Sequence, residues 1–526
     1  MNPTTGLTSH KRCLLFVVDA LAESIVRQWV EDGKLPNIST LMMRGGELQT
    51  CLSIFPSITP AATCSIATGL YPKDHGIEGA CWHDPATNST AYFGDDYQLA
   101  KQEGIRNYLV DFADRLNYQR LKSPLIYEHL FESGIESACV NYMWFRGPHV
   151  HSRTTPLALR LTAGKLVSDI RGPKILKLGD FVHSLPDGTG DPPGMLTGLF
   201  SRYGFRDETT AACTLAMAKT GTLPAFTLSY FPLNDDHGHT DGLHEAARIC
   251  VEKFDEFLGE FVDAVGGWEV VDRDYTIVIV GDHSQVEWAD SDPKVVLLDK
   301  LLSDFQLADT VAGFQEGDEL LICPNMRAAS IYMNEFNEAT REQVVKQLLE
   351  DRNVDQVIYC DEHPNNVKMY TVRTRDRGRL TFTHGRNDSP DLKPVGHDRY
   401  GNQWCVFGEL SAVDLRFDAN NCLADGDYPN ALERIAGAFH GSHTPIWVTA
   451  KPCAELAIKE ASTHAGGSHG SLHRDDSVAA LITSSDIDVG TLPAPGHARI
   501  IDVMDLCLAS LGADRSAECH PMMMAQ

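Results

Sequence analysis

The chain has 526 residues, of which 43% are hydrophobic and 22% are charged, so it has the composition of an ordinary globular protein with room for two or three domains. Its 45 basic and 72 acidic side chains give a formal charge of −27, which argues against a nucleic acid polymer or an anionic membrane as partner, because both require basic surface. A small anionic substrate is compatible with this charge, since metal ions or a local basic pocket can reverse the sign.

The first apolar run is only a few residues long and ends at Asp19. It lacks the apolar core and the cleavage site of a signal peptide, and no apolar stretch of the chain is long enough to span a bilayer. The 14 cysteines are scattered singly, without a CxxC pair. We therefore expect free thiols, no membrane partner and a cytoplasmic location.

Apolar runs rich in Val, Ile and Leu recur along the chain, and each is followed by polar residues. "CLLFVVDALAESIVRQWVEDG" predicts a strand that ends at Asp19 and then an amphipathic helix. "PAFTLSYFPLNDDHGHTDG" predicts a strand followed by an acidic, histidine-rich loop, and "HEAARICVEKFDEFLGEFVDAV" predicts the next helix. "DYTIVIVGDHS" predicts a strand that ends before Asp282 and His283. This alternation indicates an α/β protein with a mostly parallel central sheet and helices on both faces.

Two segments interrupt this alternation. Residues 306–429 contain short β runs split by Gly, Asn and Asp, with one helical pattern among them, and predict an inserted, smaller α+β cap subdomain. Residues 1–305 and 430–526 are then expected to form the catalytic core, in which "TPIWVTA" and "VAALITSS" predict further strands. Residues 85–220 are expected to supply helices and substrate-facing loops.

Hydroxyl groups cluster where the stretch "SIFPSITPAATCSIATGLYP" passes from an apolar run into a helical pattern. Thr59 precedes Pro60, so it could be a simple helix cap with proline at the favoured first helical position. A nucleophile is the other interpretation of a hydroxyl at this place. Ser57 and Thr63 are rival hydroxyls, and Thr63, one turn into the helix, is expected to bond back to the helix backbone.

Carboxylates and imidazoles follow the other predicted strands or precede them. Each one alone has a simpler interpretation as a helix cap or a solvated turn. In open α/β sheets, however, the working groups lie beyond the carboxyl ends of the strands, and carboxylate with imidazole is the ligand set preferred by Zn²⁺ and its neighbours. The candidate metal ligands are Asp19, Asp235, His239, Asp282, His283 and His469, with Thr59 as a seventh.

The order of these groups resembles the alkaline phosphatase superfamily, and within it the type I phosphodiesterase/nucleotide pyrophosphatase family. "FPSITPAATCSIATGLYPKDHGI" is similar to the family pattern of Phe-Pro, a nucleophilic Thr, Thr-Gly-Leu-Tyr-Pro and His-Gly-Ile. "NDDHGH", "GDHS" and "SHGSLHRDDSVAALI" resemble its remaining metal motifs. The resemblance covers nearly the whole chain and is weakest in the middle. Phosphonoacetate hydrolases resemble the chain as well.

The resemblance implies two metal sites, with Asp235, His239 and His469 at one, and Asp19, Asp282, His283 and the Thr59 hydroxyl at the other. Two zinc ions are implied, with manganese or iron as alternatives. The implied activity is hydrolysis of a phosphodiester or pyrophosphate bond of a small molecule through a phospho-threonine on Thr59. A phosphonate or phosphomonoester hydrolase with the same metal core is the alternative, and a non-catalytic member that only binds metal or ligand is a third.

One position departs from the family pattern. Nucleotide pyrophosphatases have an Asn three residues after His-Gly-Ile that helps to hold a phosphoryl oxygen, and Ala80 stands at that place here. The oxygen would then be held by backbone amides, by another side chain such as His83, or not at all. This departure bears on nucleotide pyrophosphatase activity more than on phosphoryl chemistry.

Several other side chains have two interpretations. The segment "WFRGPHVHSR" could bind the anionic end of a substrate, or it could be a solvated loop; its candidates are Arg146, His149, His151 and Arg153. Trp82 could stack on an aromatic group or lie in the core. His237 and His473 are expected outside the metal sites, and Asp236 could orient His239.

Overall fold

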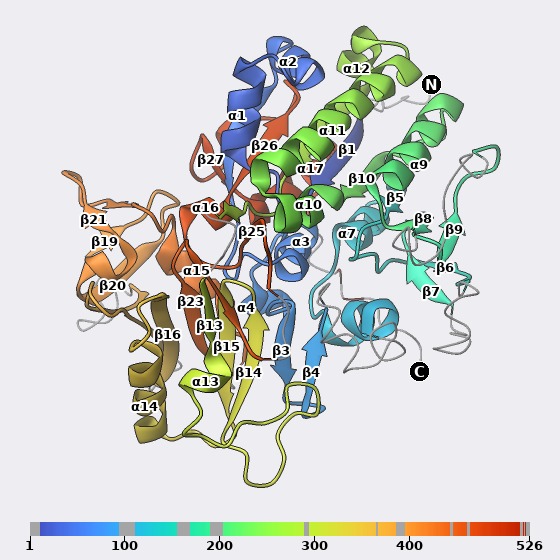
Figure 1. Ribbon diagram of the computed structural model, residues 1–526. Coiled ribbons are helices and arrows are strands. Elements are labelled where there is room, and N and C mark those ends of the chain that lie inside the picture. The colour runs from blue at the N-terminus through green and yellow to red at the C-terminus, as the bar shows by residue number, and fades with distance from the viewer. Residues whose placement is uncertain are drawn as a thin grey trace, which may run out of the picture.

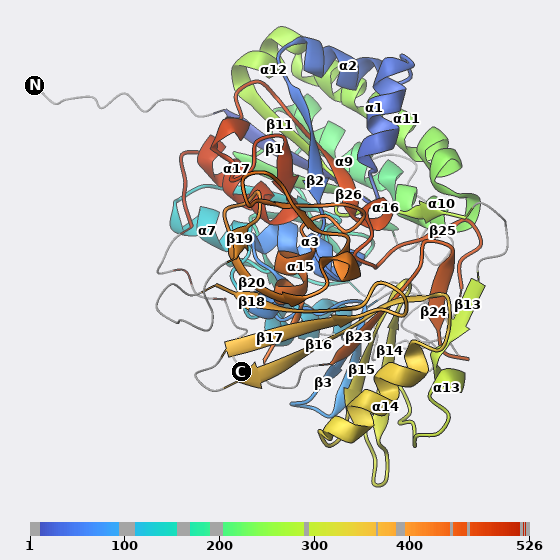
Figure 2. The ribbon, with the colours of Figure 1, turned by 90° about the vertical axis from the view of Figure 1, so that its left-hand side faces the viewer.

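The computed structural model describes residues 11–93, 111–154, 169–189, 204–288, 294–363, 367–385, 395–441, 445–459, 463–515, 519 and 521. Its main sheet has nine strands and a second sheet has eight. In both views the second sheet lies below the main one, and helices α3 (Thr59–Thr68) and α15 (Ala431–Ala438) lie between them (Figures 1 and 2).

In spatial order, the main sheet consists of β27 (His497–Arg499), β2 (Glu47–Leu52), β26 (Val478–Thr483), β11 (Tyr275–Val280), β1 (Arg12–Val18), β10 (Phe226–Phe231), β5 (Ser137–Val140), β8 (Ile175–Leu178) and β9 (Val182–Ser184). Neighbouring strands are parallel from β11 through β1, β10 and β5 to β8. Strand β26 is antiparallel to both of its neighbours. The prediction of a mostly parallel α/β sheet is confirmed.

Both faces of the main sheet are buried, which explains why its strands are continuous apolar runs. Along β1, Leu15 and Val17 pack into one core cluster, and Leu14 and Phe16 pack into the other. The helices of the first face are α3, α7 (Ile126–Glu132) and α17 (Val503–Ser510). The helices of the second face are α1 (Glu23–Glu31), α2 (Pro36–Met43), α9 (Asp207–Thr220), α11 (Leu243–Val265) and α12 (Trp268–Asp274).

The second sheet has the order β14 (Leu320–Asn325), β15 (Ala328–Met333), β23 (Ile446–Ala450), β16 (Val354–His363), β17 (Val367–Arg373), β18 (Arg379–His384), β20 (Gln403–Gly408) and β19 (Gly396–His397). Helix α14 (Glu338–Leu348) covers one face, and α15 covers the other. Strand β23 is the predicted "TPIWVTA" strand, and it pairs with β15 and β16. The second sheet therefore extends beyond residues 306–429, and the division of the chain into domains stays a prediction.

Part of the segment expected to supply substrate-facing loops, residues 94–110, 155–168 and 190–203, lies outside the described residues. Across the described parts of the chain, no helix combines the length and the apolar composition that crossing a membrane requires.

Candidate functional site

The strand order brings every predicted site residue to one edge of the main sheet. Strands β1, β10 and β11 are parallel, so their carboxyl ends lie together, and β2 has the same direction because both it and β11 are antiparallel to β26. Asp19, Asp235 and Asp282 follow β1, β10 and β11, and Thr59 follows β2. Strand β26 runs the other way, so the loop that carries His469 enters it at this same edge.

Asp19, Asp282 and His283 form the first group of potential metal ligands, and one ligand atom from each lies within 4.8 Å of the others. The Nε2 atom of His283 lies 3.5 Å from Asp19 Oδ1 and 3.4 Å from Asp282 Oδ2. Thr59 Oγ1 lies 3.0 Å from the same Nε2 atom. The structure thus brings these four side chains together, and their binding of a metal ion stays a prediction.

Asp235, His239 and His469 form the second group, within the same limit of 4.8 Å. The Nε2 atoms of His239 and His469 lie 3.3 Å and 3.4 Å from the carboxylate oxygens of Asp235. The expectation of a loop here was wrong, because residues Leu233–Asp241 form the helix α10. Asp207 accepts the Leu233 N–H and holds the start of this helix, and the i, i+4 spacing then puts Asp235 and His239 on one helix face.

The two groups adjoin each other, because the rings of His283 and His469 stack with their centroids 3.8 Å apart. Burial and the neighbouring carboxylates raise the pKa of Asp19 well above its usual value. Burial acts in the same direction on Asp235, but the imidazoles of His239 and His469 outweigh it and hold the pKa of Asp235 well below its usual value. Burial lowers the pKa of His469, which favours the neutral imidazole that metal ions require.

Three ligand atoms are buried without a hydrogen-bond partner among the described residues: Asp19 Oδ1, Asp282 Oδ2 and His469 Nε2. An unpaired buried polar atom costs about 1–3 kcal/mol, so three of them at one place need a physical reason. Side chains that bind a cation supply that reason, since their lone pairs face the ion rather than a hydrogen-bond donor.

The second nitrogen of each ring is held by a backbone carbonyl. Nδ1 of His469 donates to Ser57 O at 2.7 Å, Nδ1 of His239 to Gly467 O at 3.0 Å, and Nδ1 of His283 to Ser284 O at 3.1 Å. Because a carbonyl only accepts, each Nδ1 carries the proton and each Nε2 presents a lone pair to the site. The chemistry and the orientation of both groups therefore fit a pair of divalent ions such as zinc.

Thr59 is the first residue of α3, and no side chain caps the N-terminus of this helix. The N–H groups of the first turn and the positive end of the helix dipole therefore lie beside the Thr59 hydroxyl. The rival hydroxyls are engaged elsewhere: Thr63 Oγ1 donates to Thr59 O as predicted, and Ser57 Oγ donates to Ser471 O at 2.9 Å.

Two side chains that the sequence analysis did not single out hold the carboxylates. The Tyr230 hydroxyl donates to Asp19 Oδ2, and the Gln285 amide donates to Asp235 Oδ1. A Cβ atom on Gly238 would lie 2.0 Å from Gln285 Oε1, so glycine leaves the space that Gln285 needs. A tyrosine inside the apolar run "FTLSYF" was a usable signal, because a buried phenol needs a partner.

Glu455 organises the loop that leads to His469, and the sequence analysis missed it. Its buried carboxylate accepts hydrogen bonds from His464 Nδ1 at 2.6 Å, from the His464 N–H at 3.1 Å and from Ser468 Oγ at 2.9 Å. The His464 ring in turn lies against the His239 ring, with 4.1 Å between centroids. Glu455 thus supports both imidazoles of the second group without touching either.

The family model described as type I phosphodiesterase/nucleotide pyrophosphatase matches residues 13–406, which is more than half of the chain. The chain belongs to this family. Ectonucleotide pyrophosphatase/phosphodiesterase family member 1 from Mus musculus and that from Rattus norvegicus are 22% and 21% identical to it over 305 residues. These matches cover 57% of the chain and only 26% of either relative.

Solved structures agree with the family at the level of the fold. Phosphonoacetate hydrolase from Sinorhizobium meliloti 1021, in complex with phosphonoformate, gives a TM-score of 0.55 at 16% identity and covers 95% of this chain and 96% of its own. Murine ectonucleotide pyrophosphatase/phosphodiesterase 5 gives 0.52 at 13% identity and covers 97% of both chains. The protein has an alkaline phosphatase-like fold.

Two of the groups considered as a replacement for the family asparagine have partners within the protein. The N–H groups of Ala80 and Cys81 both donate to Asn325 Oδ1, at 2.7 Å and 3.1 Å, so these amides are engaged within the protein. The Nε2 atom of His83 hydrogen-bonds with Asn88 Oδ1 at 3.2 Å. These alternatives to the asparagine are thus engaged in local structure.

The substrate role considered for the Arg146 segment does not extend to Arg146 itself. Its guanidinium is fully buried, pairs with Glu128 at 3.1 Å and donates to three backbone carbonyls. His151 is buried as well and hydrogen-bonds with Pro173 O at 2.7 Å. Trp82 is 3% exposed and belongs to the core.

His237 and His473 have partners outside the two ligand groups. His237 pairs with Asp241 at 3.0 Å, and neither belongs to the two ligand groups. His473 Nδ1 accepts the Asp475 N–H and caps the short helix α16 (Arg474–Ser477).

Proposed function

We propose that this protein hydrolyses a phosphodiester or pyrophosphate bond of a small phosphorylated molecule, using two divalent metal ions and Thr59 as nucleophile. The observation that carries the proposal is the 3.0 Å contact between Thr59 Oγ1 and His283 Nε2, beside two adjoining groups of buried carboxylates and imidazoles. Membership of the phosphodiesterase family supports it. We expect zinc at both groups, with manganese or iron as the alternatives.

A threonine hydroxyl is too weakly acidic to attack phosphorus unaided, and divalent ions at the two groups would lower its pKa and offset the phosphoryl charge. The chain itself supplies placement. The Thr59 oxygen would bond to phosphorus as the bond to the leaving oxygen breaks, and water would later cleave the phospho-threonine. The uncapped N-terminus of α3 would donate N–H groups to the phosphoryl oxygens.

A phosphonate or phosphomonoester hydrolase is the second candidate, and Ala80 favours it. Without an asparagine at this position, one hydrogen bond to the phosphoryl oxygen is absent, which weakens the case for a nucleotide pyrophosphatase. The structurally similar proteins span both chemistries, since one was solved with phosphonoformate and an inactive form of another with AMP.

The test is activity of the purified protein against a bis-aryl phosphate, a mono-aryl phosphate, a dinucleotide and phosphonoacetate, combined with metal analysis. We expect Thr59→Ala to reduce turnover of the best substrate by about 10³-fold or more, because a nucleophile is removed. Thr87→Ala, in an exposed turn, is the matched control and should leave turnover unchanged. Full activity of Thr59→Ala, or of protein that analysis shows to be free of metal, would refute the proposal.

We also infer a cytoplasmic location, supported by the cysteines. All 14 are free thiols, and most of them are buried. Reducing compartments keep thiols in this state. Fractionation of the source cells tests the inference, and recovery of the protein outside the cytoplasm would overturn it.

A further inference from the structure

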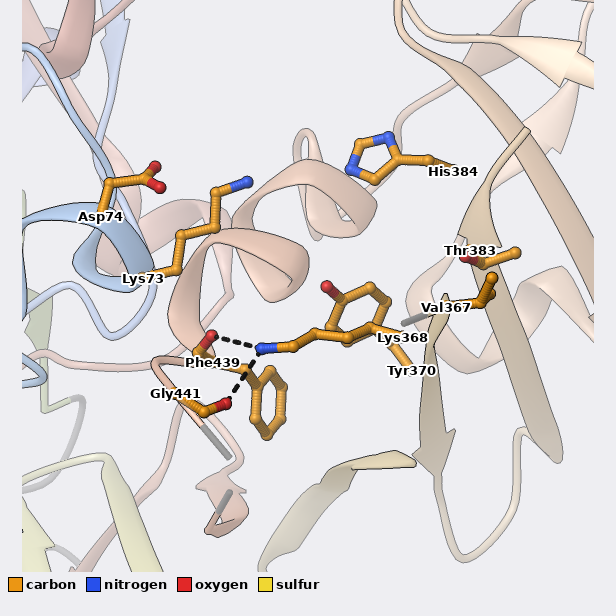
Figure 3. A pocket seen from close by; sticks show the side chains of 9 residues that line it. All are labelled: Lys73, Asp74, Val367, Lys368, Tyr370, Thr383, His384, Phe439 and Gly441. Atoms are coloured by element: carbon orange, nitrogen blue, oxygen red, sulfur yellow. Dashed lines mark hydrogen bonds between the residues drawn. The ribbon is translucent and has the colours of Figure 1, made fainter. Parts of the chain in front are cut away.

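A cavity of about 380 Å³ lies between the second sheet and the helical turn that follows α3. Its walls come from the helical turn α4 (Pro72–His75), from β17 and β18 of the second sheet, and from the segment 439–441 (Figure 3). The described residues that line it include none of the metal ligand groups. Cavities of this size between packed units are common places for small ligands.

Two lysines and one aspartate line this cavity, so its net charge is opposite in sign to that of the protein. Lys73 and Lys368 line it together with the imidazole of His384, while the whole chain carries a formal charge of −27. Figure 3 shows the side chains of Lys73 and His384 reaching toward one another across the cavity, with Asp74 beside Lys73 on the same wall. A hollow in which one sign of charge is in excess attracts the opposite ion.

Two of the polar groups of the cavity, Lys368 and His384, are held in place by the protein before any ligand arrives. Lys368 Nζ donates to the carbonyl oxygens of Phe439 and Gly441, each at 3.2 Å, and keeps a third N–H for another acceptor. The His384 ring stacks on Trp404 with centroids 4.3 Å apart. The ammonium of Lys73 has no hydrogen-bond or ion-pair partner among the residues that the structure describes.

We propose that this cavity, which we call the Lys73 pocket, is a second anion site that binds a phosphate group between Lys73, Lys368 and His384. Charge-assisted hydrogen bonds from two ammonium groups are the recognition expected for a phosphate dianion. The buried rings of Tyr370 and Phe439, 5.7 Å apart, form an apolar wall that could accept an organic substituent. The same chemistry fits free phosphate and the phosphate of a small phosphorylated molecule.

Calorimetric titration of the full-length protein with orthophosphate, before and after removal of metal by chelation, separates this pocket from the metal groups. We expect one binding event to survive chelation. Lys73→Gln should weaken it by about tenfold, the value of one charge-assisted hydrogen bond, and Lys73→Gln combined with Lys368→Gln should abolish it. Lys346→Gln, an exposed lysine of α14, is the control for a change of charge alone.

A parallel titration with AMP distinguishes the two sources of phosphate. Equal affinity for AMP and orthophosphate assigns the pocket to free phosphate, and tighter binding of AMP assigns it to a phosphorylated molecule that uses the apolar wall. Absence of phosphate binding to the chelated protein, or equal weakening by Lys346→Gln and Lys73→Gln, would overturn the proposal. Thermal unfolding of each variant shows whether a lost signal comes from lost folding.

Discussion

Glu455→Gln tests whether a carboxylate that touches no predicted ligand controls one of the two metal sites. The two carboxylate oxygens of Glu455 accept from three donors, two on Oε1 and the His464 N–H on Oε2. A glutamine has one accepting oxygen and one donating amide, so in either orientation its NH₂ meets a donor. The change keeps the size of the side chain and removes at least one hydrogen bond.

The lost hydrogen bond sets the size of the expected decrease in metal affinity. A buried donor left without its acceptor costs about 1–3 kcal/mol, which corresponds to about 5- to 150-fold in an equilibrium constant. Changes to groups that orient metal ligands commonly lower metal affinity by about 10- to 100-fold. We therefore expect Glu455→Gln to weaken metal at Asp235, His239 and His469 by about 10- to 100-fold and to leave the Asp19 group nearly unchanged.

Competition with a chromophoric zinc chelator, read as two separate dissociation steps, measures this difference. Glu78→Gln is the control for changing a buried glutamate to glutamine, because Glu78 is also buried and its partner is the Tyr332 hydroxyl at 3.0 Å. If Glu455→Gln lowers the melting temperature while both metal affinities stay at the values of the parent protein, Glu455 has only a structural role and the reasoning fails.

Two further predictions concern the support of the site and the pH dependence of folding. Gly238→Ala would place a Cβ atom 2.0 Å from Gln285 Oε1. Because the end of a glutamine side chain can swing away, we expect the variant to fold and to bind metal about tenfold more weakly. Metal titration measures this affinity, and an unchanged affinity would contradict the prediction. Burial raises the pKa of Glu78 to about 8, against 4.5 for an ordinary glutamate. Between these values the folded state holds one proton more than the unfolded state, so folding stability falls as pH rises, by up to about 1.4 kcal/mol per pH unit. Glu78→Gln should remove this contribution to the slope of unfolding free energy against pH, measured by urea unfolding between pH 5 and 7.5, and parallel profiles for both proteins would contradict it.

The sequence predicted what local pattern and strand direction determine. Continuous apolar runs gave the parallel sheet, and the rule that working groups follow parallel strands put Asp19, Asp235 and Asp282 at one edge. Prediction from local composition failed at α10, because its polar, glycine-containing sequence is typical of a loop. That helix depends on Asp207, which is 26 residues from its partner Leu233, and such a contact leaves no trace in local composition.

The supporting residues were missed for the same reason. No sequence pattern marks Gln285 or Glu455, because each acquires its role from a partner on another segment of the chain. Arg146 shows the converse, because an arginine beside two histidines suggests an anion site until Glu128 is seen to pair with it inside the core. Strand β23 reads as a strand of the core, and only its pairing with β15 and β16 shows the sheet to which it belongs.

The distribution of the ligands separates metal binding from folding. Large apolar clusters cover both faces of both sheets, whereas the seven predicted site residues are polar and lie at the sheet edge, so we expect the core to form without an ion. Small metal-dependent domains lack such a core and unfold when chelated. A metal ion has its effect at the sheet edge instead. Burial and the neighbouring carboxylates raise the pKa of Asp19, which means that the ionised carboxylates repel one another there. A bound cation would relieve that repulsion. Chelation should therefore act on the chemistry while the fold persists, which is why loss of activity on metal removal can be assigned to the site itself.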